Sequence, residues 1–506
     1  MKGHHNHSRE ITERIHISGC LTLLTPTHLG NGAVRGDALV DMALLLDEAD
    51  GTPFIPGTTI AGALRAYLRT RLGGHRATRE AAPVVTLFGP ARSEDDPTLE
   101  QSALIIDDAS VALDAAGRPR FATTLRDGVR IDPTTNLAFI DDHGNGAKYD
   151  MELLEAGTSF DLHLELLGTA RHPTAEVLPY LVQALEGLET GEIRLGLRKR
   201  RGLGRVTVAD WRMSRYRMNA PAELCAWLET PSWAHRSGTA VARVRDLVPA
   251  AAAVADSRRT LRLAATFSLA ESSVLIRSGF GRLDGGPDVE HLHVRQADGA
   301  RTPVIPGTSW AGVLRHRATR IANTIGDANA GTTPAQLVDD LFGWTPEDNR
   351  LASGSASRLL VDDSPILDGQ SLYQTRVRID RFTGGALDAH LFDEAPVYGL
   401  PATTVTLKLQ VQDPTAADIG LLLLLLKDLW TQDLPVGGEA AVGRGRLTGM
   451  IAELALPDVD GAVVIVAAQP DMGLDATARA DLQQYVDALW AALAGSVDEQ
   501  GVHAHA

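Results

Sequence analysis

The chain contains the same sequence pattern twice. Residues 55–65 read IPGTTIAGALR, and residues 305–315 read IPGTSWAGVLR. Five further pairs of similar segments follow in the same order in both halves. These pairs are LFG at 87–89 and 341–343, SALIIDDAS at 102–110 and SRLLVDDS at 357–364, RDGVRID at 126–132 and QTRVRID at 374–380, leucine-rich stretches at 175–187 and 416–430, and glycine-rich segments at 196–206 and 437–447. Chance similarity does not keep such an order, so the sequence predicts a tandem duplication of one folding unit.

The duplication sets the expected domain boundaries. The two copies span 12–212 and 258–455, and residues 213–257 are expected to form a partly helical connector. The remaining segment, 456–506, contains apolar residues at helical spacing within 474–494, which predicts a docking helix. The residues expected on its packed face are Leu482, Tyr485, Val486, Leu489, Trp490 and Leu493.

Composition excludes several classes of protein. The 506 residues carry 48 Lys and Arg against 64 Asp and Glu, a formal charge of −16, which argues against a uniformly basic nucleic-acid-coating protein but not against a local basic groove. With Cys20 and Cys225 as its two cysteines, the chain can build neither a disulfide framework nor a multi-cysteine zinc site. No apolar run is long enough for a membrane span, and the start lacks the apolar core of a signal peptide. We therefore expect a cytoplasmic protein.

Each copy reads as strand, glycine loop, strand, helix, further strands, helix and strand. Residues 15–24 have the composition of a strand, residues 39–46 resemble a second strand, and a helix is expected after Pro56 and Gly57. Thr58 or Thr59 could cap that helix, and Thr308 or Ser309 could cap its counterpart. Strands with two helices on one face predict the α+β class, with two tandem ferredoxin-like domains.

Two glycine-rich loops recur in both copies. The first contains Gly30, Gly32 and Gly36, but its glycine spacing is not that of the dinucleotide-binding fingerprint, and a strand rather than a helix is expected after it. A Walker lysine followed by serine or threonine is also missing, which argues against nucleotide hydrolysis.

The second loop combines glycines with clustered cations. In the first copy, Gly202 and Gly204 lie among Arg198, Lys199, Arg200, Arg201 and Arg205, and in the second copy Gly443 and Gly445 lie beside Arg444 and Arg446. Glycine lets a backbone approach a ligand closely, and clustered cations repel one another unless an anion pairs with them. A lone basic run would most simply be a solvated turn. Its recurrence favours a polyanion that crosses both copies, bound through its phosphates. Arg65 and Arg315, which follow the two IPG motifs, are further candidates for contact with this polyanion.

The ordered motifs resemble those of the RAMP superfamily. The order is IPG(T/S)xxxGxLR, LFG, DD(A/S), RxxVxID and a terminal GxGR loop, and IDRFTGGA at 379–386 followed by LFDE at 391–394 is a close match. More narrowly, the chain resembles backbone subunits of type III CRISPR effector complexes, and the two fused modules resemble subunits of type III-D and III-E systems. The resemblance covers nearly all of 12–455.

The resemblance implies a fold, a ligand and a reaction. Modules of this family have an RNA-recognition-motif-like ferredoxin fold and bind a guide RNA, and a hairpin from each module displaces bases at intervals. The segments that resemble these hairpins are 132–147 and 383–390. Target RNA is then cut beside an aspartate with Mg²⁺ or another divalent metal. Asp41 matches that position, also as the metal ligand, and Asp37 is its rival.

The second copy departs from the family pattern. His28 matches a family histidine and is expected to bind RNA or to be structural, and Arg277 is aligned with it in the second copy. No aspartate is expected at the position of Asp41 there, but Asp288 falls just before it and is the catalytic candidate. Arg277 would suit a phosphate contact, and activity of the second copy is left open.

Several functions are therefore weighed. The leading one is a guide-RNA-bound backbone subunit that cleaves complementary target RNA and assembles with other type III subunits, including a large polymerase-like one. The first alternative is a non-catalytic RNA-binding subunit of the same complex. The second is a guide-processing RAMP endoribonuclease, which would rely on His28 and need no metal. An unrelated duplicated metabolic enzyme is disfavoured by the ordered motifs.

Overall fold

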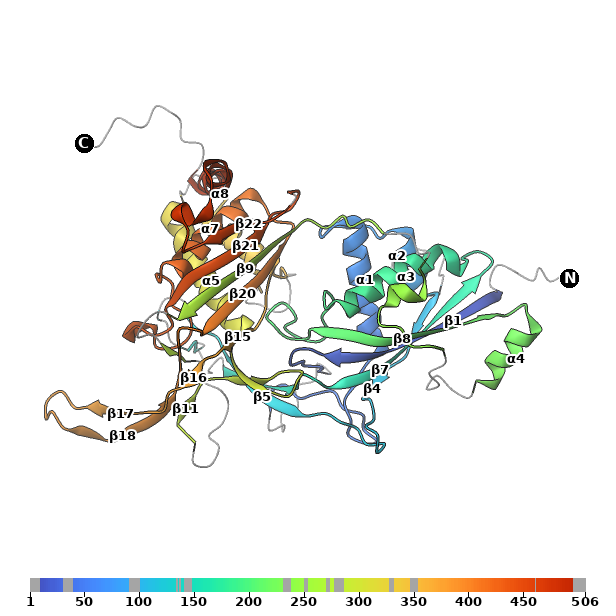
Figure 1. The fold of residues 1–506 in the computed structure, drawn as a ribbon, viewed down its shortest axis with the longest axis horizontal. Coiled ribbons are helices and arrows are strands. Elements are labelled where there is room, and N and C mark those ends of the chain that lie inside the picture. The colour runs from blue at the N-terminus through green and yellow to red at the C-terminus, as the bar shows by residue number, and fades with distance from the viewer. Residues whose placement is uncertain are drawn as a thin grey trace.

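The computed structural model describes residues 10–30, 40–90, 101–132, 135, 138–140, 148–230, 238–249, 254–269, 274–276, 286–326, 332–345, 354–459 and 461–494. Two units of similar element order follow one another along the chain (Figure 1). We call the unit from β1 to β8 module 1 and the unit from β9 to β21 module 2.

Module 1 begins at Ile11, and its last strand runs past the expected boundary at 212. Its elements are β1 (Ile11–Leu23), β2 (Phe54–Ile55), α1 (Gly57–Gly73), α2 (Ala82–Phe88), β3 (Leu104–Ile106), β4 (Ala109–Ser110), β5 (Thr123–Val129), β6 (Lys148–Leu154), β7 (Ser159–Thr169), α3 (Thr174–Glu189) and β8 (Val206–Arg217). The connector then holds α4 (Pro221–Glu229) and a 3-10 turn, η2 (Val244–Leu247).

Module 2 repeats this order with additional short strands. Its elements are β9 (Thr260–Leu269), β10 (Val274–Leu275), β11 (Val289–Glu290), β12 (His293–Arg295), β13 (Arg301–Ile305), α5 (Gly307–Ile325), α6 (Pro334–Phe342), β14 (Leu359–Val361), β15 (Ser364–Leu367), β16 (Gln370–Ser371), β17 (Gln374–Ile379), β18 (Ala386–Ala395), β19 (Val397–Tyr398), β20 (Thr404–Gln412), α7 (Ala416–Trp430), η3 (Ala440–Val442) and β21 (Leu447–Ala455). The chain continues with β22 (Val463–Val466), η4 (Pro470–Gly473) and α8 (Ala476–Ala494).

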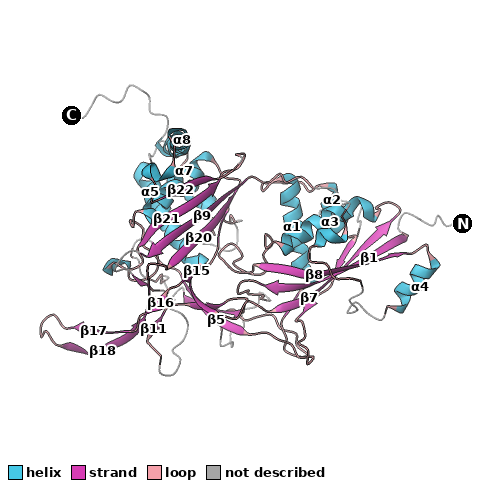
Figure 2. Ribbon diagram, in the orientation of Figure 1, coloured by secondary structure: helices cyan, strands magenta, loops and turns pink. Residues whose placement is uncertain are grey.

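Both modules are built on the same antiparallel sheet. The strand order is β3-β7-β1-β8 in module 1, and the corresponding strands of module 2 lie in the order β14-β20-β9-β21. Helices α1 and α3 pack on one face of the first sheet, and α5 and α7 pack on one face of the second (Figure 2). Helices on one face of an antiparallel sheet confirm the α+β class. Among the described residues, none of the helices has the length and apolar character that a membrane-crossing segment needs.

The helix after each IPG motif starts differently from the prediction. The N-cap of α1 is Pro56, and no side chain caps it from within the helix. Instead, the Asp108 carboxylate accepts the Gly57 N–H at 2.7 Å, and in module 2 the Asp363 carboxylate accepts the Gly307 N–H at 2.8 Å. A carboxylate at a helix N-terminus satisfies a free donor and suits the helix dipole. The second aspartate of each Asp-Asp motif therefore caps a helix that begins earlier in the sequence.

Two further expectations differ from the structure. No regular strand forms over the described part of 39–46, where only isolated bridges at Met42 and Leu46 occur. The C-terminal docking helix does form: α8 packs on α7, with Leu489 and Leu493 fully buried. Trp490, which was expected on the packed face, is 52% exposed.

Candidate nucleic-acid interface

Each module extends one long β-hairpin away from its helices. Strands β5 and β6 form the hairpin of module 1, and β17 and β18 form that of module 2. Both hairpins lie on the lower side of the molecule in Figure 1, opposite the helices of the two modules. Hairpin segment 383–390 belongs to the β17–β18 hairpin, whereas most of 132–147 lies outside the described residues. A ligand that ran along this side would meet both hairpins in turn.

The two candidate aspartates occupy the same place in the two modules. Asp41 Oδ2 accepts the backbone N–H of Asp150 in β6 at 2.9 Å, and the next residue, Met42, forms a parallel bridge with Met151. Asp288 Oδ2 accepts the backbone N–H of Asp393 in β18 at 2.9 Å. The strand that follows Asp288, β11, likewise pairs in parallel with the continuation of β18. Asp288 is thus the structural counterpart of Asp41, at a position where no aspartate was expected.

In each module, a guanidinium lies over an aromatic ring of the hairpin strand whose amide binds the candidate aspartate. In module 1, Arg198 lies 4.6 Å from the ring centre of Tyr149, the residue before Asp150. In module 2, Arg376 lies 5.7 Å from the ring centre of Phe392, the residue before Asp393. The two arginines come from different elements, the glycine-rich loop in one module and the hairpin strand in the other. Both modules therefore place a cation over the ring of the residue that precedes the amide donor, by different routes.

The cation of module 2 is neutralised by acidic neighbours. Arg376 pairs with Glu394 at 3.3 Å and with Glu439 at 2.9 Å, and Glu439 occupies the loop position of Arg198. No carboxylate partner of Arg198 is found among the residues that the structure describes. Among the described residues, the charge of Arg198 is therefore not compensated by a carboxylate, whereas that of Arg376 is.

His28 is a buried structural residue. It is 4% exposed, and its Nδ1 lies 2.8 Å from the Glu152 carbonyl oxygen. The His28 carbonyl accepts the Leu197 N–H at 3.0 Å, just as the Ile276 carbonyl accepts the Gly438 N–H at 2.9 Å. Ile276, and not Arg277, is therefore the counterpart of His28.

The spacing between equivalent residues is not constant along the two copies. It is 246 residues from Leu23 to Leu269, 248 from His28 to Ile276 and 247 from Asp41 to Asp288, so no single offset aligns all of them. Arg277 and Asp37 lie outside the described residues, so the structure places neither.

The basic loop of module 1 packs against module 2. Arg201 donates to the carbonyl oxygens of Phe342 at 3.2 Å and Leu359 at 3.4 Å, and the Arg200 carbonyl accepts the Val361 N–H at 3.1 Å. Burial, together with the charges of Arg315, Arg200 and Arg198, lowers the pKa of Arg201 to about 10. Much of the loop that was expected to bind a polyanion therefore forms the contact between the modules, although Lys199 remains exposed.

The loop glycines approach the chain itself. Gly204 and Gly445 have φ of 77°, and a Cβ at either position would lie 1.9 Å from the Leu195 carbonyl oxygen or 2.1 Å from that of Val436. A Cβ at Gly202, whose φ is 93°, would lie 2.0 Å from an Asp363 oxygen. Close backbone approach was the expected role, but the groups approached here are protein atoms.

Three more arginines that were predicted to contact RNA are instead bonded to groups within the protein. Arg444 is buried, bonds the Glu394 carboxylate and pairs with Glu439 at 3.1 Å. In the helices, the Arg65 Nε donates to Glu80 at 2.9 Å, and the Arg315 guanidinium donates to the Gly343 carbonyl at 2.6 Å. Arg205 is half-buried and its counterpart Arg446 is exposed.

Exposed cations on the hairpins were missed by the sequence analysis. Arg130 and Arg378 are equivalent exposed residues near the ends of β5 and β17, and Arg381 is exposed in the turn of the second hairpin. Phe382, beside it, is 93% exposed. The repeated Val-Arg-Ile-Asp at 129–132 and 377–380 carried the signal, because an arginine between apolar residues of a hairpin points to the opposite face from them.

The residues around Asp41 fit a metal ion only in part. The described residues contain no group of three His, Cys, Asp or Glu side chains that could hold one. Asp41 itself is exposed and uses Oδ2 for the Asp150 amide. Mg²⁺ is commonly bound through one or two carboxylates plus substrate phosphates and water, so Asp41 could hold it with RNA present.

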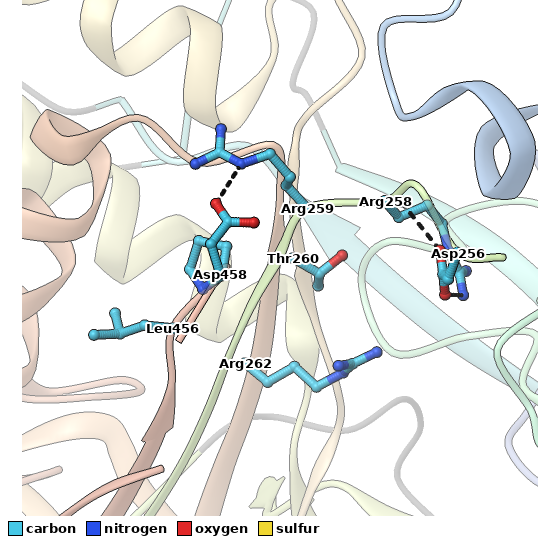
Figure 3. A pocket seen from close by; sticks show the side chains of 8 residues that line it. Asp256, Arg258, Arg259, Thr260, Arg262, Leu456 and Asp458 are labelled. Atoms are coloured by element: carbon cyan, nitrogen blue, oxygen red, sulfur yellow. Dashed lines mark hydrogen bonds and ion pairs between the residues drawn. The ribbon is translucent and has the colours of Figure 1, made fainter. Parts of the chain in front are cut away.

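A polar cleft at the start of β9 offers no comparable site. Figure 3 shows its lining, in which Arg258 is paired with Asp256 and Arg259 with Asp458. Arg258 also pairs with Glu192 at 2.9 Å and stacks on Tyr67, so it ties the connector to module 1. These cations are already compensated.

Comparison with protein families identifies both modules. The sequence pattern described as the RAMP superfamily matches residues 20–207 and 269–448, which are the two modules. No curated protein matches the chain.

Proposed function

The chain belongs to the RAMP superfamily, whose members are generally CRISPR-associated RNA-binding proteins, and we propose that it is a guide-RNA-binding backbone subunit of a type III effector complex. We infer that its two sheets have the ferredoxin-like arrangement, since strands and helices alternate as βαββαβ in both modules. Two fused modules favour the type III-D or III-E class. A large polymerase-like subunit is the expected partner, and the cytoplasm the expected location.

One observation carries the proposal. Both modules extend a hairpin on the same side of the molecule. Each also holds a carboxylate against the second strand of its hairpin, Asp41 on β6 and Asp288 on β18. A single strand of RNA lying along this side would pass two equivalent carboxylates. Arg130, Arg378 and Arg381 would contact its phosphates.

The proposed reaction is cleavage of the target RNA beside the carboxylate. The RNA's own 2′-hydroxyl would attack the adjacent phosphorus, and the 5′-oxygen would leave. A divalent ion, when bound with Asp41, supplies charge stabilisation at the phosphate. The chain's own groups have two roles: the Asp150 amide orients the Asp41 carboxylate, and Arg198 contacts the phosphate beside it.

Module 1 is proposed as the stronger cleavage centre. Its guanidinium, Arg198, keeps an uncompensated charge, whereas Arg376 of module 2 is shared between two glutamates. A cation that is already paired contributes less to a developing negative charge. Cleavage at the module 2 position is expected to be slower for this reason.

Isosteric substitution of the two aspartates tests the proposal. With guide RNA and Mg²⁺, Asp41→Asn should abolish one cut in a complementary RNA and Asp288→Asn the other, while the binding affinity for RNA stays within about twofold. Asn can still accept the backbone N–H, so the hairpin geometry is preserved. Asp47→Asn, in an exposed turn of the same segment, is the control and should cut normally.

The alternatives give different results. If both variants cut at every position, the catalytic assignment is wrong and the chain is a binding subunit. A guide-processing endonuclease would cut repeat RNA without metal through a histidine, and the burial of His28 disfavours that role.

A further inference from the structure

The contact between the modules joins two different surfaces. Module 1 contributes its glycine-rich loop and the neighbouring arginines, which we call the donor loop (194–203 with Arg126). Module 2 contributes β14 and the two aspartates after it, which we call the acceptor edge (359–363). Arg194 pairs with Asp362, Arg126 pairs with Asp363 at 3.1 Å, and the Arg200 carbonyl accepts the Val361 N–H. A contact between two unlike surfaces leaves one of each kind unused at the ends of the pair.

Module 1 carries an acceptor edge of its own. Strand β3 is the edge strand of its sheet, and Asp107 and Asp108 follow it as Asp362 and Asp363 follow β14. Asp108 caps α1 through the Gly57 N–H, as Asp363 caps α5. The first edge therefore has the same local geometry as the one that already binds a donor loop.

Among the described residues, the first acceptor edge is more exposed than the second. Asp108 is exposed, whereas the Asp363 side chain is 9% exposed beneath the donor loop. Ile105 in β3 is 40% exposed, and no loop among the described residues bonds the Ile106 N–H as Arg200 bonds that of Val361. Burial raises the pKa of Asp107, and repulsion from Glu165 and Asp108 raises it further, whereas His163 lowers it. An open strand edge beside two carboxylates is suited to a cationic loop.

The chain's second loop does not match this edge. The donor residues Arg194, Arg200 and Arg201 correspond to Pro435, Ala441 and Val442. Val442 is 63% exposed, so these loop positions present apolar side chains instead of guanidinium groups, although Arg446 at the end of the loop is exposed. A second copy of this chain would therefore lack guanidinium groups at the three positions equivalent to Arg194, Arg200 and Arg201.

We propose that the acceptor edge of module 1 (104–108) is a docking surface for an arginine-bearing glycine-rich loop of a different protein chain. The partner supplies guanidinium groups to Asp107 and Asp108 and a backbone carbonyl to the Ile106 N–H. The second loop of this chain lacks arginines at the three equivalent positions, so a second copy does not bind at this edge. Charge therefore fixes the order of the subunits. This inference rests on the proposed role in a larger assembly but not on RNA binding or cleavage.

Converting the second loop into a donor loop tests this surface without RNA. The full chain carrying Pro435→Arg, Ala441→Arg and Val442→Arg serves as the probe, and Glu439 is kept because it binds Arg376 and Arg444. In sedimentation velocity at low salt, the wild type should remain monomeric. The converted chain should shift to dimers and longer assemblies and should return to monomer in high salt.

Substitutions at the acceptor edge complete the test. Adding Asp107→Asn and Asp108→Asn to the converted chain should abolish the assemblies, while the amide oxygen introduced by Asp108→Asn can still accept the Gly57 N–H and cap α1. Asp210→Asn, on β8 at the opposite edge of the sheet, should leave them intact. Circular dichroism and the melting temperature show that each variant is folded.

Three outcomes would overturn the proposal. The converted chain could stay monomeric, it could associate regardless of Asp107 and Asp108, or the wild type could associate through those residues. The last result would mean that a second copy is the occupant. Because no RNA is present, failure here is distinct from failure of the cleavage experiment.

Discussion

Gly443 and Gly445 lie two residues apart in one loop, and both have a positive φ, 87° and 77°. A Cβ at Gly443 would meet no atom within 4 Å, but a Cβ at Gly445 would lie 2.1 Å from the Val436 carbonyl oxygen. Gly443→Ala should therefore lose only the conformational term, about 1–2 kcal/mol of the free energy of unfolding. Gly445→Ala adds a backbone clash and should lose at least about 2 kcal/mol more, measured by urea unfolding. Equal losses would contradict a packing role for Gly445.

Single residues show how far the sequence could predict the site. Asp41 is selected, and Asp288 is named although its position is not expected to match, because the IPG motifs lie 250 residues apart whereas Asp41 and Asp288 lie 247 apart. Arg444 and Arg65 were expected to bind RNA, but their partners Glu394 and Glu80 come from other elements. A sequence shows where charges are, but their availability depends on contacts that only the fold determines.

At the scale of elements, α8 packs on α7 through one narrow face. Leu489 is fully buried in this contact, while the adjacent Trp490 is half-exposed. Leu489→Ala should lower the free energy of unfolding by about 2–5 kcal/mol, because it leaves a cavity. Trp490→Ala should change it by about 0.5 kcal/mol or less. Thermal unfolding of the two variants compares them directly, and a larger effect at Trp490 would show that the face is wrongly assigned.

Elements with a clear period or composition were predictable. The first strand, the helix after IPG and the C-terminal helix follow from local patterns, and they form as β1, α1 and α8. The segment 39–46 has strand-like residues, but its described part, 40–46, forms only isolated bridges, to Met151 of the hairpin strand and to Pro53 after a turn. The Asp-Asp caps could not be predicted from local sequence, since Asp108 acts on a helix that starts 51 residues earlier.

At the scale of the whole molecule, the modules are arranged head to tail. The donor loop of module 1 contacts the acceptor edge of module 2, while the loop of module 2 packs beside its own hairpin through Glu439 and Arg376. The duplication predicted two similar folds, but their relative orientation depends on ion pairs such as Arg126–Asp363, made by arginines that the second copy does not have at the equivalent positions. The two cationic loops therefore do not form one continuous basic surface. The first loop is largely covered by module 2, and the second carries fewer cations than the first.

The ion pair between Arg126 and Asp363 should couple the two modules. Both side chains are nearly buried, and Asp363 also caps α5, so the isosteres Arg126→Gln and Asp363→Asn are the suitable changes. A double-mutant cycle on the free energy of unfolding should give a coupling of about 1–3 kcal/mol, because the charges interact away from water. The pair of Arg118 and Asp114, whose arginine is 76% exposed, should couple by about 0.5 kcal/mol or less. If the two cycles gave equal coupling, the modules would be held together by packing alone, and charge would not set their orientation.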